Sequence, residues 1–234
     1  MAISRLNLLL GLNMEGMEQA KGALEVNERL VDAMRQGKAL RQLSRLLHRD
    51  GQLDAAEEAA SKAIKLFLDK GDQFQVCRCH RVLGNICHSR GEAKKAIDHY
   101  ETALGIASSF GWHNHIFWTH CSYSELFFSE NRFDEAHGHI EHAKSHTTDD
   151  PYKLGHATEL QAGFWYGRHM LEEAQSEALH ATDIFEKIGA AKDAERCTVL
   201  VRRIEKAASR KLGSNGKLLE TMLLPTPFNS LLSV

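Results

Sequence analysis

The stretch that decides the fold is VLGNICHSRGEAKKAIDHYETAL, residues 82–104. Two segments with apolar residues at helical spacing flank Gly91, a residue suited to the left-handed conformation that ends a helix. Three stations of small residues in this stretch recur at intervals of 40 residues: Gly11, Gly51, Gly91 and Asn131; Gly16, Ala56, Ala96 and Ala136; and Ala23, Ala63, Ala103 and Ala143. A fixed period of this length indicates stacked helix pairs, in which each pair buries its apolar face against its neighbours.

The preceding repeat shows why such a pair would pack. Leu43 and Leu47 form a helical stripe, and Gly51 then allows a tight turn into a second helix. Ala56 and Ala63 on the second helix let the two helices approach closely, while the leucines fill the gap. A further copy of the pattern follows a two-residue deletion, at His169, Ala174 and Ala181.

The repeats resemble the tetratricopeptide repeat (TPR), whose pattern is Leu-Gly, then Gly-x-Tyr-x-x-Ala, then an aromatic residue and an alanine. The unit that begins at Cys77 matches this pattern most clearly, with Leu83-Gly84, Gly91-Glu92-Ala93, Ala96, Tyr100 and Ala103. Some units have leucine or alanine in place of the turn tyrosine, and the second helices do not end on a proline. The period exceeds the TPR length of about 34 residues, which implies two longer helices.

We therefore predict an all-α fold: a right-handed, TPR-like α-solenoid of antiparallel helix pairs, with a repeat of about 40 residues and a C-terminal capping helix. The repeat domain should span residues 1–212, and residues 213–234 should form a disordered tail. Its parts should be an incomplete first unit at 1–36, units at 37–76, 77–116, 117–154 and 155–189, and the capping helix at 190–212. One side of the capping helix should face solvent, with Arg196, Arg202, Arg203 and Lys206.

A second resemblance concerns the stretch from Cys77 to Ala107 and the phrase Arg132-Phe133-Asp134-Glu135-Ala136. Both are similar to repeats at the C-terminal end of certain fungal proteins, in which a nucleotide-binding NB-ARC module precedes a long TPR arm. The NB-ARC part has no counterpart in this sequence, so the resemblance carries over no ATPase activity. It implies the sensor arm of a signalling protein.

The composition excludes several classes of function. The net charge of −2 provides no global attraction to nucleic acid or to acidic membranes, and no apolar run approaches the ~20 residues of a membrane helix. Five cysteines, an odd number, favour reduced thiols in a cytosolic or nuclear protein, and of these we predict a cytoplasmic location. The segment Gly213–Leu218 lacks the spacing of a phosphate loop, and no nucleophile elbow or His-Glu-x-x-His motif occurs. We predict no enzymatic activity, no catalytic residue and no cofactor.

Histidines and cysteines raise a metal or redox alternative. His139, His142 and His146 lie near one face of a helix, and a second cluster contains Cys77, Cys79, His80, Cys87 and His88. The repeat phase leaves the first group at or near solvent and places most of the second on a packing stripe. We therefore predict no metal site, and keep a metal-binding or redox-responsive protein as the alternative function.

In TPR arrays the first helix of each unit lines a concave groove. Carried across by the repeat phase, this resemblance implies a groove lined by Lys38, Arg41, Arg45, His48, Arg49, Arg78, Arg81, Asn85, His88, Trp118, Glu125, Phe128, Glu159 and Tyr166. Arginines hold carboxylates, and exposed aromatic residues anchor apolar side chains. We expect a protein partner whose bound peptide or helix has an acidic and a hydrophobic portion.

Two other readings of this groove stay open. Its arginines could instead neutralise the nearby Asp54, Glu57 and Glu58 on a solvated face. The basic half could also bind nucleic acid, although it lacks interleaved aromatic residues. Separately, the uncapped apolar first unit could pair with a second copy of the chain.

Overall fold

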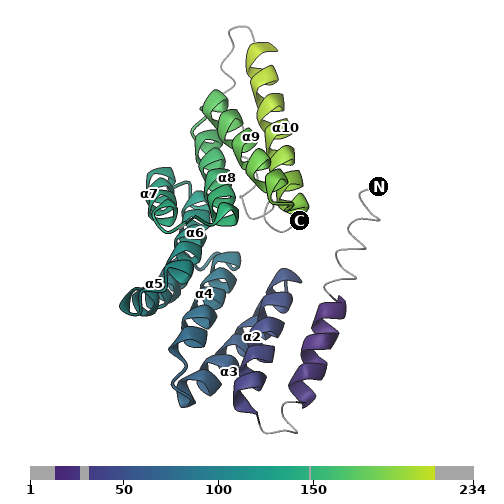
Figure 1. Ribbon diagram of the computed structural model, residues 1–234, viewed down its shortest axis with the longest axis vertical. Helices are drawn as coiled ribbons and strands as arrows, with labels where there is room; N and C mark the ends of the chain where they lie inside the picture. Colours follow the sequence, from purple (N-terminus) through teal and green to yellow (C-terminus); the bar gives the residue numbers. More distant parts are fainter. Residues whose placement is uncertain (1–13, 27–31, 148, 214–234) are drawn as a thin grey trace. The chain divides into compact units, whose positions relative to one another are not determined.

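The computed structural model describes residues 14–26, 32–147 and 149–213, and in these residues all regular structure is helical (Figure 1). The helices are α2 (Ala33–Arg49), α3 (Leu53–Asp69), α4 (Gln73–Ser89), α5 (Ala93–Ser109), α6 (His113–Ser129), α7 (Phe133–Lys144), α8 (Pro151–Gly167), α9 (Leu171–Lys187) and α10 (Ala191–Gly213). A further helix covers residues 14–26. The all-α prediction is therefore confirmed. None of these helices is long and apolar enough to cross a membrane.

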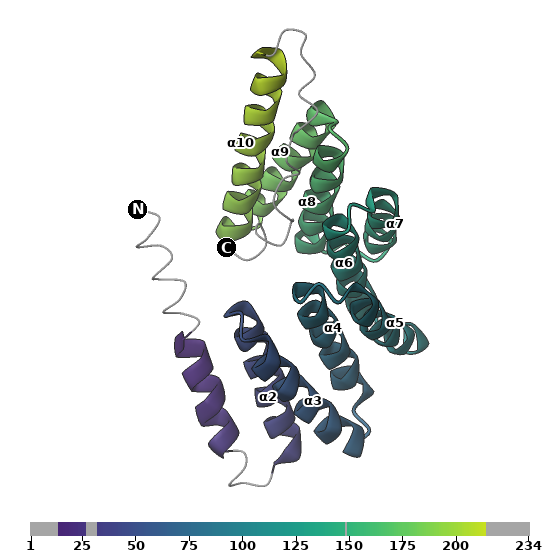
Figure 2. The same ribbon diagram turned by 180° about the vertical axis from the view of Figure 1, so that it is seen from behind.

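The chain divides into two compact units, residues 1–115 and 116–234, and each is described by itself. In the first unit α2 packs on α3, α3 on α4 and α4 on α5, and the helix at 14–26 lies beside α2 in both views (Figures 1 and 2). One continuous apolar core joins these elements, from Met17 and Ala20 through Phe67 to Ile86. The helix pairs therefore bury their apolar faces against their neighbours, as the period predicts.

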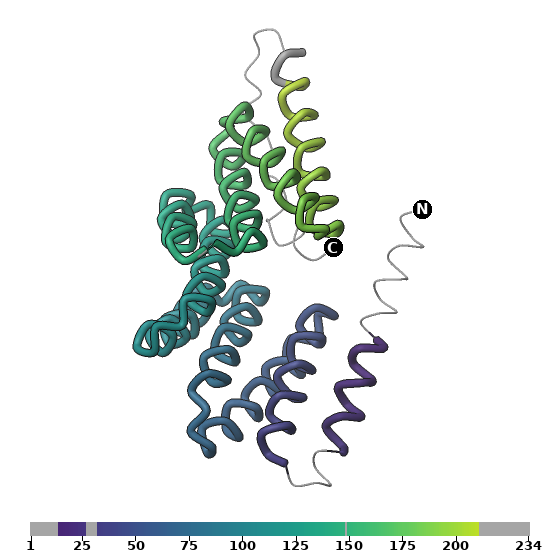
Figure 3. The backbone as a smooth tube through the Cα atoms, viewed as in Figure 1, coloured from purple at the N-terminus to yellow at the C-terminus, as the bar shows by residue number. Residues whose placement is uncertain are grey.

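In the second unit α7 packs on α8, α8 on α9, and α9 on α10 (Figure 3). Cys197, Leu200, Val201 and Ile204 on α10 are buried. α10 begins 40 residues after α8, so it stands where the first helix of a further pair would begin. The predicted disordered tail after residue 213 lies outside the described residues, as do residues 1–13 of the predicted first unit.

The turns between helices repeat every 20 residues, which is half the period read from the sequence. One residue in each connection between successive helices from α2 to α10 has positive φ: Gly51, Gly71, Gly91, Gly111, Asn131, Asp149, His169 and Gly189. Glycine adopts this conformation without steric cost, and among the other residue types Asn and Asp tolerate it best. Seventeen helical residues and a three-residue turn make one 20-residue block, and only the interval from 131 to 149, which contains the 12-residue α7, is shorter.

Small residues at matched positions determine how closely the helices approach. Ala56, Ala63, Ala96 and Ala103 are completely buried, and so are the equivalent alanines of the later units. Glycines on first helices lie against aromatic rings of second helices, since a Cβ added at Gly84 would overlap the ring of Tyr100. The prediction of closely packed alanine stations is confirmed from Ala56 onward, whereas Ala23 is exposed and Gly11 lies outside the described residues.

Candidate functional site

Six cations lie on the first helices of two successive pairs in the first unit. We call this set the basic face: Lys38, Arg41, Arg45 and Arg49 on α2, and Arg78 and Arg81 on α4. Lys38 and Arg78, like Arg41 and Arg81, are 40 residues apart and so occupy equivalent positions. α2 and α4 contact each other directly, which brings the two rows of cations together.

Arg41 is the buried member of the basic face. Only 8% of the residue is exposed, and no acceptor within the described residues hydrogen-bonds its Nε. Burial, together with the charges of Arg78, Arg45 and Arg81, lowers the pKa of Arg41 to about 10. The cluster therefore places several like charges around a desolvated guanidinium, an arrangement that an added anion would stabilise.

The acidic residues named as neutralising partners bind other cations instead. Asp54 and Glu57 on α3 both pair with Arg90, and Glu58 pairs with Lys62. The reading in which these three carboxylates neutralise the groove arginines is therefore wrong.

Three other predicted groove residues serve packing between helices. The Nε2 atom of His48 lies 2.8 Å from the Ser89 hydroxyl, and Asn85 Oδ1 accepts a hydrogen bond of 2.8 Å from Tyr100. His88 is buried, and burial together with the nearby His48 lowers its pKa to about 4.

An exposed aromatic cluster adjoins the basic face, and the sequence analysis did not include it. We call it the aromatic patch: Phe74, Phe110 and Trp112. Phe74 and Phe110 are 40% and 55% exposed, and the ring of Trp112 stacks on Phe110 at 4.6 Å. The Arg78 guanidinium lies 5.8 Å from the Phe74 ring centre, which joins the two features. Phe110 and Trp112 flank Gly111, so the sequence indicated only a turn there.

The predicted groove residues of the second unit differ in exposure. Trp118, Glu125 and Tyr166 are half-buried, and the Trp118 ring lies 5.1 Å from His156. Phe128 is buried against Phe133. These positions form a more apolar surface than the basic face of the first unit.

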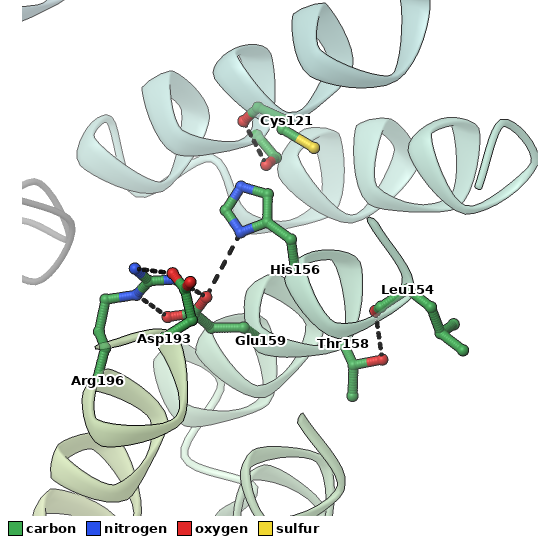
Figure 4. Close-up of polar contacts among 8 residues, drawn as sticks. Cys121, Leu154, His156, Thr158, Glu159, Asp193 and Arg196 are labelled. Atoms are coloured by element: carbon green, nitrogen blue, oxygen red, sulfur yellow. Dashed lines mark hydrogen bonds and ion pairs between the residues drawn. The ribbon is translucent and has the colours of Figure 1, made fainter. Parts of the chain in front are cut away.

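Glu159 is not available to a partner, because it belongs to a buried ion-pair network between α8 and α10 (Figure 4). Arg196 donates to both Glu159 carboxylate oxygens at 2.5 and 2.6 Å, and to Asp193 at 2.7 Å. Burial raises the pKa of Glu159, but the hydrogen bonds from Arg196 and His156 outweigh it and the net shift is downward. The prediction that Arg196 faces solvent is wrong, whereas Arg202, Arg203 and Lys206 are exposed.

Histidines pair across helices at equivalent positions in successive repeats. The Nδ1 atoms of His80 and His99 are 3.2 Å apart, and those of His120 and His139, each 40 residues later, are 2.8 Å apart. Burial lowers the pKa of His120 and of His139 to about 4, with neighbouring histidines as the next cause. His139 is half-buried, which agrees with the expected position near solvent, but its pairing with His120 on α6 was not predicted from the sequence.

The cysteines are core residues. All five are buried free thiols, and burial raises the pKa of Cys77 to about 11 and of Cys79 to about 12. The described residues contain no group of three or more His, Cys, Asp or Glu side chains arranged to hold a metal ion. A buried thiol that stays protonated is unreactive, so the geometry favours packing over redox chemistry at these positions.

No family model matches the sequence, and no curated protein matches it. Solved structures do resemble the fold. BtubC (BKLC) from P. vanneervenii is 18% identical, with a TM-score of 0.61 over 92% of this chain and 98% of its own. A Rap protein complexed with Competence and Sporulation Factor is 14% identical, with a TM-score of 0.58 over 85% of this chain. Aspartyl phosphate phosphatase F from Bacillus subtilis is 12% identical, with a TM-score of 0.58 over 92% of this chain.

The chain spans 60% of the length of each of the last two proteins. At these identities the likeness concerns the fold alone. It agrees with the stacked helix pairs described above. The protein has a TPR-like, all-α repeat fold.

Proposed function

We propose that the chain is a non-enzymatic scaffold that binds a protein partner, and that its basic face receives an acidic peptide or helix. The observation that carries this proposal is the gathering of six cations on α2 and α4 while the nearby carboxylates of α3 bind Arg90 and Lys62. A surface with excess positive charge on a chain of net charge −2 favours an acidic partner and speeds its association.

The comparisons support a binding role without naming the partner. One similar structure is a Rap protein complexed with Competence and Sporulation Factor, so a related fold holds another molecule. We extend this to the present chain as a cytoplasmic sensor arm of a signalling protein, with no cofactor. Within the second unit, taken by itself, the half-buried Trp118 and Tyr166 offer an apolar contact surface to a protein partner.

The test is selection from a random peptide display library on the immobilised protein, followed by fluorescence anisotropy with the selected peptides. Enriched peptides should contain Asp or Glu. The double substitution Arg45→Glu and Arg49→Glu should raise their Kd at least tenfold, because both side chains are exposed on the basic face.

The matched control is Arg202→Glu with Arg203→Glu, which makes the same change of charge on the exposed side of α10. The control should change Kd less than threefold, and circular dichroism should show that both variants are folded. If no peptide is enriched, or if both double variants weaken binding equally, the proposed function is wrong.

A further inference from the structure

The basic face contains one cation whose environment is incomplete without an anion. Arg41 is more than nine-tenths buried, and its Nε lies unpaired among the described residues. Buried polar groups in folded proteins are almost always hydrogen-bonded, so an orphaned donor needs an explanation. A buried guanidinium is also costly unless an opposite charge compensates it.

The groups packed around Arg41 supply no such charge. From α2 the neighbour that acts on it is Arg45, and from α4 the neighbours are Arg78, Arg81 and the Cys79 thiol. Asp72, which caps α4, accepts a hydrogen bond from the Gln75 backbone N–H. None of the groups that act on Arg41 is a carboxylate, so an anion from outside these elements would compensate its charge.

We propose that Arg41, Arg45 and Arg78 form an oxyanion-binding site, and that the adjoining aromatic patch holds an apolar side chain next to that oxyanion. This inference rests on the proposed function and specifies which group of the partner is recognised. Guanidinium groups bind carboxylate and phosphate oxygens through paired, charge-assisted hydrogen bonds. Arg78 lies against Phe74, so one side chain belongs to both halves of the site.

The occupant is a peptide segment in which an acidic or phosphorylated residue neighbours an aromatic or aliphatic residue. A nucleic acid fits less well, since strands are held by rows of cations along a backbone and the net charge of the chain is −2. Here the cations converge on one buried guanidinium. The exposed rings of Phe74 and Phe110 provide an apolar contact beside it.

Nuclear magnetic resonance of the protein with ¹⁵N-labelled arginine tests this site directly. The probes are acetylated peptides of sequence Gly-Glu-Phe-Glu-Gly, its glutamine analogue Gly-Gln-Phe-Gln-Gly, its alanine analogue Gly-Glu-Ala-Glu-Gly, and a phosphoserine analogue in place of glutamate. The glutamate peptide should shift the Arg41 Nε–Hε signal. The glutamine and alanine analogues should each bind at least fivefold more weakly.

Variants Arg41→Met and Arg78→Met should each raise the Kd at least fivefold, whereas Arg203→Met on the exposed side of α10 should leave it unchanged. Replacement of a buried uncompensated charge by methionine should not unfold the chain, and the Tm of Arg41→Met checks this. Tighter binding of the phosphoserine peptide would support the site and identify phosphate as the oxyanion. Binding of the glutamate peptide alone would identify carboxylate.

The inference is overturned if neither acidic peptide shifts the Arg41 signal, if Arg41→Met behaves like Arg203→Met, or if a uridine decanucleotide binds more tightly than both acidic peptides. Peptides selected by display separate the two proposals. If they bind Arg41→Met and Arg78→Met as tightly as the natural sequence, the oxyanion site is wrong and the scaffold function stands. If display enriches no peptide, both fail.

Discussion

At the scale of single residues, Gly84 shows how one absent side chain determines the distance between two helices. It is buried on α4, and the Tyr100 ring from α5 lies where a Cβ would stand. Tyr100 is completely buried and donates a hydrogen bond to Asn85, so it has no room to move away. The same arrangement recurs at Gly37 with Phe67 and at Gly155 with Phe185.

Gly84→Ala should therefore lower the free energy of unfolding by about 2 kcal/mol, because overpacking a rigid core displaces the ring or the helix. The matched control is Gly105→Ala on α5, where a Cβ meets nothing within 4 Å. That substitution should stabilise the protein by about 0.5–1 kcal/mol through helix propensity. Urea denaturation measures both, and equal effects in the two variants would contradict the role of Gly84.

Single residues also show which features of the structure could not be predicted from the sequence. Buried alanine stations were predictable because they repeat with a fixed period. The ion pair of Arg196 with Glu159 was not, since the residues are 37 positions apart and carry no motif. The same is true of the aromatic patch, because its members come from the start of α4 and a turn.

At the scale of elements, the histidine pairs join the first and second helices of a repeat. Two imidazoles whose Nδ1 atoms are 2.8 Å apart share one proton, because a second proton would bring two positive charges together. The pair of His120 and His139 therefore prefers to be at most singly charged. The ring of His139 also stacks on Tyr123 at 4.4 Å, which fixes its position.

This pairing predicts a dependence of stability on pH. The pKa of His120 and of His139 falls from 6.5 to about 4 on folding, so between these values the unfolded chain binds more protons than the folded chain. The stabilisation is complete above pH 6.5 and is lost as the pH falls toward about 4. The free energy of unfolding should therefore decrease as the pH is lowered from 6.5 to about 4.

Urea denaturation at several pH values measures this slope. His139→Gln should reduce it without removing it, because His88 and His115 have pKa values lowered to about 4 as well. His180→Gln, on the exposed part of α9, is the control and should leave the slope unchanged. An unaltered slope in His139→Gln would exclude the pair as its cause.

Element boundaries were only partly predictable. The periodicity gave the helix pairs and their order, but α2, α4 and α6 each begin four residues before the unit boundary at 37, 77 and 117. The first turn of each of these helices contains none of the periodic small residues, so the repeat pattern could not locate the helix start. The aspartates that cap α2 and α4 mark the starts, since Asp32 and Asp72 each accept a backbone hydrogen bond there.

At the scale of the whole molecule, stacked pairs contact only their neighbours, so a local defect should stay local. Glu159→Gln leaves the Arg196 charge half-buried and without its main partner, which should cost about 3–5 kcal/mol. Hydrogen exchange should accelerate in α8–α10, while α2–α4 keep their protection. Asp183→Asn removes only an exposed ion pair with Lys187 and should change little.

A uniform loss of protection across both units in Glu159→Gln would mean that the whole chain unfolds in one cooperative step and would contradict this prediction.

Self-association through the first unit remains a prediction, because residues 1–13 and 27–31 lie outside the described residues. Sedimentation equilibrium of the full chain would test it.

The even spacing of the left-handed turn residues has a consequence for how such a chain can change in length. Because every block of helix and turn except the one containing α7 has the same number of residues, an in-frame duplication of one regular pair would leave each turn glycine at a helix end. New copies would carry their own cations and small residues with them. Evolution or engineering could thus extend the ligand-contacting surface by copying, and could then vary each copy separately.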